Sequence, residues 1–173
     1  MITKREFSFI GLVIICIMSA TLINLSASYR KSRDNERKNA LGDIVRRVGD
    51  FQKTLATFPL SDDNYAIVGC NGFRDELGRW FFKSCTWGEN SVNSPFFDPL
   101  PQDPYSNEKG RRFVYISNGK TFQIYTALER TNDEEYDPQI VARNISCGDV
   151  VCNAGRTNGD ISILYSELPP ATP

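Results

Sequence analysis

The chain has 173 residues, of which 40% are hydrophobic and 24% charged, and this length suits one domain with a core plus an appendage. It contains no histidine, which excludes histidine-based acid–base chemistry, the usual serine and cysteine nucleophile arrangements, and most catalytic zinc sites. The net charge of −1 conceals an asymmetry, because residues 1–58 carry ten Lys and Arg against five Asp and Glu, whereas residues 59–173 carry ten against sixteen.

The N-terminus consists of a short basic leader, residues 1–6, followed by residues 7–28, which carry no charged side chain. The run from Phe7 to Leu25 is long enough, at about 1.5 Å per helical residue, to cross a hydrocarbon core of roughly 30 Å. A cleaved signal peptide is the alternative, because small residues precede Tyr29 as they would precede a cleavage site. The apolar run exceeds the usual signal-peptide core, which favours a retained single-pass anchor in the lipid bilayer.

Residues 29–58 should continue the helix beyond the membrane. Residues 29–39 are polar all round without Pro or Gly, which predicts a solvated helix with Asp34 and Lys38 paired at i, i+4. Apolar residues then recur with helical spacing until Pro59, so residues 7–58 would form one helix of about 78 Å. The stripe expected to pack on the head comprises Leu41, Ile44, Val45, Val48, Phe51, Leu55 and Phe58.

Residues 59–173 are expected to form a globular α+β head with a frayed C-terminal tail. The strongest local pattern predicts an antiparallel hairpin of residues 112–117 and 121–128 around Asn118-Gly119, a dipeptide favoured in two-residue turns. The helix stripe and one face of this sheet can bury each other, which gives the α+β fold class.

Other parts of the head give weaker signals. The segment 64–91 is rich in Gly and aromatic residues and predicts an irregular connection pinned by a disulfide. Residues 161–165 are β-rich enough to add a strand, and residues 138–145 are an ambiguous further candidate.

The five cysteines divide into Cys16 in the apolar run and four beyond it. An even set outside the membrane favours disulfides in an oxidising compartment, and we expect Cys70 to pair with Cys85 and Cys147 with Cys152, because each pair closes a local loop. A zinc site is the alternative, but the fourteen residues between Cys70 and Cys85 do not suit the close spacing of zinc ligand pairs.

The charges on the two sides of the apolar run indicate a different orientation from the one that disulfides in the head require. The five basic residues from Arg30 to Lys38 outnumber Lys4 and Arg5, and for an ordinary anchor this imbalance argues for an N-terminus outside the cytoplasm. The disulfides instead argue for a head outside the cytoplasm and an N-terminus within it.

The order of these features resembles the type IV pilin and type II secretion pseudopilin family. "FSFIGLVIICIM" is similar to the Phe-initiated membrane segment of the family, "SYRKSRDNERKNALGDIVRRVGDFQKTLATFP" to its long helix, and "LPQDPYSN" and "FQIYTALE" to its loop and strand. The resemblance implies a pilin-like fold with a cytoplasmic N-terminus, which resolves the charge conflict. It also implies a structural subunit, anchored in the inner membrane, that joins copies of itself or other pilin-like subunits in an extracellular filament through an inner-membrane assembly platform.

Two residues depart from the family's processing pattern. Family precursors are cut after a Gly that precedes the Phe, whereas this chain has Glu6 before Phe7. The fifth residue of the mature family segment is usually Glu, and here that position is Gly11. A carboxylate in lipid needs a partner, which in the family is the amino terminus of a neighbouring subunit. This chain lacks both the glycine before Phe7 and the glutamate at position 11. Because the glutamate's partner would form only on cleavage, the loss of both predicts an uncleaved leader.

The resemblance also raises calcium as a cofactor. In several major pseudopilins an acidic loop holds calcium, and Glu129, Asp133, Glu135 and Asp137 fall in the equivalent region of this chain. Their oxygen ligands would suit Ca²⁺.

The competing function is an uncleaved, membrane-anchored binding module. Its ligand surface would use aromatic residues that are otherwise expected in the core, namely Phe73, Trp80, Phe81, Phe82, Trp87, Phe96 and Phe97. Nucleic-acid binding is not expected, because the basic helix adjoins an apolar run and has no interleaved aromatics. Clustered acids are more often a solvated face than a catalytic site, so no enzymatic activity is expected.

Overall fold

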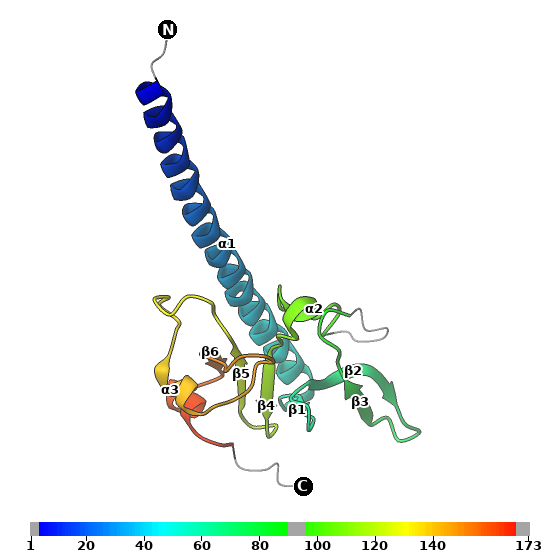
Figure 1. Cartoon of the computed structure of the whole chain (residues 1–173). Helices are drawn as coiled ribbons and strands as arrows, with labels where there is room; N and C mark the ends of the chain where they lie inside the picture. Colours follow the sequence, from blue (N-terminus) through cyan, green and yellow to red (C-terminus); the bar gives the residue numbers. More distant parts are fainter. Residues whose placement is uncertain (1–3, 90–95, 169–173) are drawn as a thin grey trace.

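One helix, α1, runs without a break from Lys4 to Leu55 and carries the head on its second half (Figure 1). The structure, a computed structural model, describes residues 4–89 and 96–168, and for residues 4–8 it describes the backbone alone. The predicted long helix is confirmed, and at about 1.5 Å per residue its 52 residues extend over about 78 Å.

The helix ends at Leu55, three residues before the end that the sequence predicted. Ala56 adopts a left-handed φ of 60°, a conformation that often follows the last residue of a helix. The Phe58 amide then donates to the Gly119 carbonyl at 2.9 Å, in the hairpin of the head. A tertiary contact therefore accompanies the end of the helix, before Pro59 is reached.

Within the described residues, the head contains two three-stranded antiparallel sheets, ordered β1-β2-β3 and β4-β5-β6. The sheets adjoin through β1 and β4, where the Ser117 amide donates to the Ser61 hydroxyl at 3.2 Å. The strands are β1 (Leu60–Ser61), β2 (Ile67–Arg74), β3 (Trp80–Ser84), β4 (Val114–Ser117), β5 (Phe122–Thr126) and β6 (Ala154–Thr157). The short helices are α2 (Ser106–Lys109), α3 (Pro138–Ala142) and the 3-10 helix η1 (Ile161–Tyr165).

The predicted hairpin is confirmed as β4 and β5, but its turn is longer than expected. Ser117 pairs with Phe122, so four residues, 118–121, connect the strands instead of the three between the predicted runs. The Asn118 side chain accepts hydrogen bonds from the Lys120 and Thr121 amides at 3.1 and 3.0 Å. This side-chain turn replaces the tight two-residue turn that Asn-Gly favours.

The segment 64–91, expected to be irregular, contains the β2-β3 hairpin. The two strands pair as far as Arg74 opposite Trp80, with shifts of register on the way. Asp75 closes the turn, because its carboxylate accepts from the Arg79 amide at 2.8 Å. The glycines and register shifts in this hairpin hid the strand alternation from sequence reasoning.

Three elements near the C-terminus also differ from expectation. Residues 161–165 form η1 and not a strand, and the Asp160 side chain caps this helix by accepting from the amide two residues later. Residues 138–145 begin with α3, which Asp137 caps in the same way. Strand β6, which the sequence did not predict, pairs along β5. Local capping therefore outweighed β propensity in both helices.

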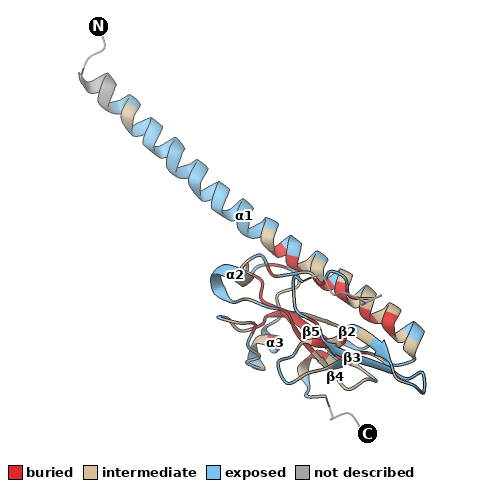
Figure 2. Cartoon of the chain, turned by 90° about the vertical axis from the view of Figure 1, so that its right-hand side faces the viewer, coloured by how far each residue is buried: buried red, intermediate tan, exposed pale blue. Residues whose placement is uncertain are grey.

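The expected helix stripe packs on the head, which confirms the α+β fold class. Figure 2 shows buried positions on the second half of α1, on the side that faces the head. Four stripe residues are buried, namely Leu41, Ile44, Val48 and Phe51, whereas Val45, Leu55 and Phe58 are partly buried against the same cluster. They pack with residues of the head that include Phe97, Phe113, Tyr115, Phe122 and Ile124.

The other face of β4 and β5 is buried as well, because α3, η1 and the Cys147–Cys152 loop cover it. Every residue of β5 is buried, so this strand lies at the centre of the head. Both predicted disulfides, Cys70–Cys85 and Cys147–Cys152, are present. Cys16 is a free, exposed cysteine in the first half of α1.

Candidate functional site

The first functional feature is the apolar half of α1, residues 9–28. All of its described side chains are exposed apart from the half-buried Gly11, and the helix is long and apolar enough to cross a membrane. Its large exposed hydrophobic residues are Phe9, Ile10, Leu12, Val13, Ile14, Ile15, Ile17, Met18, Leu22, Ile23 and Leu25. Contiguous apolar surface of this extent marks contact with lipid or with other proteins.

The residues that the resemblance associates with leader processing lie at or just before the start of this half. Glu6 and Phe7 belong to the first turns of α1, but their side chains lie outside the described part of the structure. Gly11 lies in the helix, where an added Cβ would meet no atom within 4 Å. The fold therefore leaves room for the glutamate that the resemblance places at this position.

The second feature is a group of buried charges where α1 meets the head. The expectation of a solvated helix over residues 29–39 is confirmed only in part: the segment is helical and mostly exposed, but Asp34 and Arg37 are both completely buried. We define the junction cluster as Arg33, Asp34 and Arg37 of α1 with Asp103 and Glu129 of the head.

Arg37 is the centre of the junction cluster. Its Nε and Nη2 donate to the two Asp103 carboxylate oxygens at 2.8 and 3.2 Å. Its Nη1 donates to Asp34 and to Glu129, each at 3.0 Å. Three carboxylates thus share one guanidinium, which is a geometry that the planar fork of arginine suits and the lysine ammonium does not.

Asp34 and Arg33 fix the loop that follows β5. The Asp34 carboxylate accepts from the backbone amides of Glu129 and Arg130 at 2.8 and 3.1 Å. Arg33 donates from Nε and Nη2 to the Glu129 carboxylate at 2.7 and 2.6 Å. The expected Asp34–Lys38 pair is replaced, because Lys38 donates to Asp133 of the same loop at 3.0 Å.

The electrostatics follow from these contacts. Burial raises the pKa of Glu129, but the hydrogen bonds from Arg33 and Arg37 outweigh it and lower the pKa to about 2. Burial lowers the pKa of Arg37, but its hydrogen bonds with Asp103 and Glu129 outweigh that effect and raise it. Glu129 and Arg37 are therefore both charged at neutral pH.

We expect acid to loosen the junction through Glu129. Because the folded pKa of this group is depressed from 4.5 to about 2, its stabilisation is present above pH 4.5 and is lost as the pH falls toward 2. Urea denaturation of the full-length chain in detergent, followed by near-UV circular dichroism, should show Glu129→Gln to be less stable than wild type at pH 7. The difference should shrink between pH 4.5 and 2. A difference that does not change with pH would contradict this role.

The proposed calcium ligands are not brought together. Glu129 and Asp133 bind α1, Glu135 accepts from Arg156 at 2.9 Å, and Asp137 accepts from the Tyr165 hydroxyl at 2.7 Å. Among the described residues, no group of three or more His, Cys, Asp or Glu is placed to hold a metal ion. These acids act instead as partners for basic groups and hydroxyls of the protein.

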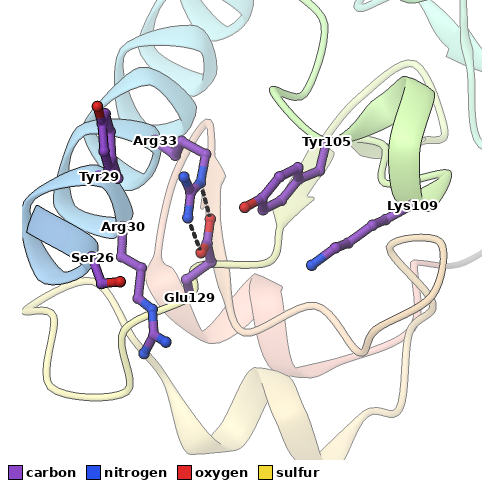
Figure 3. A pocket seen from close by; sticks show the side chains of 7 residues that line it. All are labelled: Ser26, Tyr29, Arg30, Arg33, Tyr105, Lys109 and Glu129. Atoms are coloured by element: carbon purple, nitrogen blue, oxygen red, sulfur yellow. Dashed lines mark hydrogen bonds and ion pairs between the residues drawn. The ribbon is translucent and has the colours of Figure 1, made fainter. Parts of the chain in front are cut away.

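An open hollow of about 470 Å³ lies beside the junction cluster, between α1 and α2 (Figure 3). The Tyr105 ring forms one wall, and four cationic side chains surround it. Lys109 Nζ lies 4.3 Å from the ring centroid, and the guanidinium carbons of Arg33, Arg111 and Arg37 lie at 4.6, 5.4 and 5.8 Å. The lining residues are Ser26, Tyr29, Arg30, Arg33, Tyr105, Lys109 and Glu129.

The aromatic residues of the head divide between core and surface. Phe97 is buried, and Phe82, Trp87 and Phe96 are partly buried against the core, as the core interpretation expected. The exposed remainder, Phe73, Trp80 and Phe81, lies on the β2-β3 hairpin. Phe73 stacks on Phe81 with their ring centroids 5.5 Å apart, so the hairpin presents an ordered aromatic surface.

The chain matches no protein-family model, and no curated protein or solved structure is significantly similar to it.

Proposed function

We propose that this chain is a structural pilin-like subunit of a type IV pilus or type II secretion-like filament, anchored in the inner membrane before assembly. The observation that carries the proposal is the division of α1 into two halves on one continuous axis. The first half exposes apolar side chains all round, and the second half buries its stripe in the head. Such a helix can exchange lipid for the apolar helices of neighbouring subunits.

The junction cluster suits this role, because a filament subunit must hold its head at a fixed height and angle on the helix. Bidentate ion pairs specify direction as well as distance, and Arg37 makes one to Asp103 while Arg33 makes another to Glu129. In this proposal the role of the protein is assembly and not catalysis. Its partners are copies of itself or other pilin-like subunits, the assembly platform and the lipid bilayer, and nucleic acid is not among them.

The two disulfides support an orientation with the head outside the cytoplasm and the N-terminus within it. The second candidate function is a monomeric, uncleaved, membrane-anchored binding module. The exposed aromatic residues of the β2-β3 hairpin favour it, because they offer a contact surface on the head. The two functions differ in whether the chain enters filaments.

The N-terminal peptide, measured by mass spectrometry in membrane and sheared-filament fractions, tests both. We expect it to begin at Met1 or Ile2, because Glu6 replaces the glycine before the cleavage point. The retained charges of Lys4 and Arg5 should hold the N-terminus at the cytoplasmic face, so the protein should fractionate mainly with the inner membrane and occur in filaments at low stoichiometry.

Restoring the family pattern provides the matched comparison. Glu6→Gly with Gly11→Glu should increase both cleavage and incorporation where the assembly machinery is present, and the room around Gly11 permits this change. The control, Glu6→Gly with Gly11→Gln, has a side chain of the same length without the charge and should be cleaved but poorly incorporated. A native N-terminus at Phe7 would overturn the uncleaved leader alone, whereas one at Tyr29 would show a signal peptide and overturn the proposed function.

A further inference from the structure

We propose that the hollow between α1 and α2 binds the phosphate group of an anionic phospholipid, from the leaflet on the head's side of the membrane. The inference rests on the membrane insertion in the proposed function, but not on filament assembly. Three observations carry it: the depth of the hollow along α1, the cations that line it, and the way its carboxylate is neutralised.

The hollow lies where the apolar half of α1 ends. Leu25 is the last large apolar residue of that half, and Arg30 follows it by about 7.5 Å along the helix axis at 1.5 Å per residue. The headgroup layer adds about 5–8 Å to each side of the hydrocarbon core. With the apolar half in the core, Tyr29 and Arg30 therefore lie at headgroup depth, which is also where tyrosine is enriched in membrane proteins.

The head contributes to the same depth through α2. Lys109 is the last residue of α2, and its ammonium lies over the Tyr105 ring. Arg30 of α1 and Lys109 of α2 both line the hollow, and in Figure 3 Glu129 lies between their charged groups. Two cations from separate elements thus border an open space at the depth of the lipid headgroups.

The charge balance of the hollow favours an anion. Its lining contains the cations Arg30, Arg33 and Lys109 against one carboxylate, Glu129. The Arg33 and Arg37 guanidinium groups already hold that carboxylate. Within the described residues, neither Arg30 nor Lys109 has a carboxylate partner. Both are available to a phosphate, in the manner of the basic pockets that hold lipid headgroups beside transmembrane helices.

Retention of phosphatidylglycerol by the full-length chain tests the site. The chain is reconstituted in nanodiscs of phosphatidylcholine with a minor fraction of phosphatidylglycerol, released into detergent, and its bound lipids are counted by native mass spectrometry. We expect one phosphatidylglycerol to be retained in preference to phosphatidylcholine. Arg30→Gln and Lys109→Gln should each lower that preference about fivefold, and the double variant about 25-fold.

Lys31→Gln is the matched control, because Lys31 is exposed, adjoins Arg30 and does not line the hollow. It removes the same charge only about 1.5 Å further along the helix axis and should leave retention unchanged. Equal losses in Lys31→Gln and Arg30→Gln would show diffuse attraction and overturn the site, as would an absent preference in wild type. Inorganic phosphate at millimolar concentration should not displace the lipid, and displacement would assign the hollow to a free ion instead.

Reconstitution separates this inference from the proposed function. A chain that fails to insert in the nanodisc would contradict membrane anchoring, and with it the proposed function. A chain that inserts with an intact near-UV spectrum but shows no lipid preference would overturn the headgroup site alone.

Discussion

Replacing Arg37 with leucine should destabilise the head by about 3–5 kcal/mol, because a buried charge cluster would lose its only shared cation. The Arg37 side chain is completely buried and forms ion pairs with Asp34, Asp103 and Glu129. Leucine would leave these carboxylates facing one another with Arg33 alone to neutralise them. Such a loss is comparable to much of the stability of a small domain.

Urea denaturation of the full-length chain in detergent, followed by near-UV circular dichroism, measures this effect in the head. Arg46→Leu is the matched control, because Arg46 lies on the same helix with a side chain that is 63% exposed, and this change should shift stability little. Arg37→Lys keeps the charge but loses the planar guanidinium, so its stability should fall between those of wild type and Arg37→Leu. Equal stability of Arg37→Leu and Arg46→Leu would show that the cluster does not hold the head.

The burial of these charges also bears on how specifically the junction positions the head. Taking ions out of water costs several kcal/mol for each ion, and their attraction offsets this only when the geometry is nearly ideal. An apolar contact would tolerate sliding of the head along α1. The bidentate pairs of Arg33 with Glu129 and of Arg37 with Asp103 can form at only one position of the head along the helix. The cluster therefore contributes more to the fixed position of the head than to its net stability.

The features that the sequence predicted correctly depend on local patterns. Helical spacing from Leu41 to Leu55 identified the buried stripe, and alternating residues around Asn118-Gly119 identified the β4-β5 hairpin. The disulfides were predictable because each pair closes a short loop, with separations of 15 and 5 residues. Each of these patterns lies within a window of about twenty residues.

The junction cluster was missed because its partners are remote in the sequence. Arg37 meets Asp103 and Glu129 at separations of 66 and 92 residues, and nothing within residues 29–39 distinguishes a buried arginine from a solvated one. One signal was available, because charged residues with helical spacing continue into an apolar stripe on the same side of the helix. Side chains three and four residues apart share a face, so Asp34 and Arg37 could have been placed in line with Leu41.

Introducing aspartate at Val48 should unfold the head while leaving the membrane anchor intact. Val48 is completely buried at the middle of the helix stripe, between Ile44 and Phe51. Burying an unpaired carboxylate there costs several kcal/mol, which approaches the whole stability of a small domain. Phe51→Asp should act in the same way, because Phe51 also loses its ring contacts with Phe82 and Phe96, whose centroids lie 5.2 Å away.

Two measurements on the full-length chain separate loss of the head from loss of insertion. Near-UV circular dichroism should show a collapsed signal for Val48→Asp at room temperature, whereas carbonate extraction should still find the chain in the membrane, because residues 9–28 are unchanged. Asn39→Asp supplies the control, since it adds the same charge at an exposed position of α1 and should melt like wild type. If Val48→Asp and Phe51→Asp both kept the wild-type melting temperature, the stripe could not be the surface on which the head is built. Loss of membrane association in Val48→Asp but not in Asn39→Asp would instead mean that the head and the apolar half of α1 depend on each other, against the separation of roles along the helix.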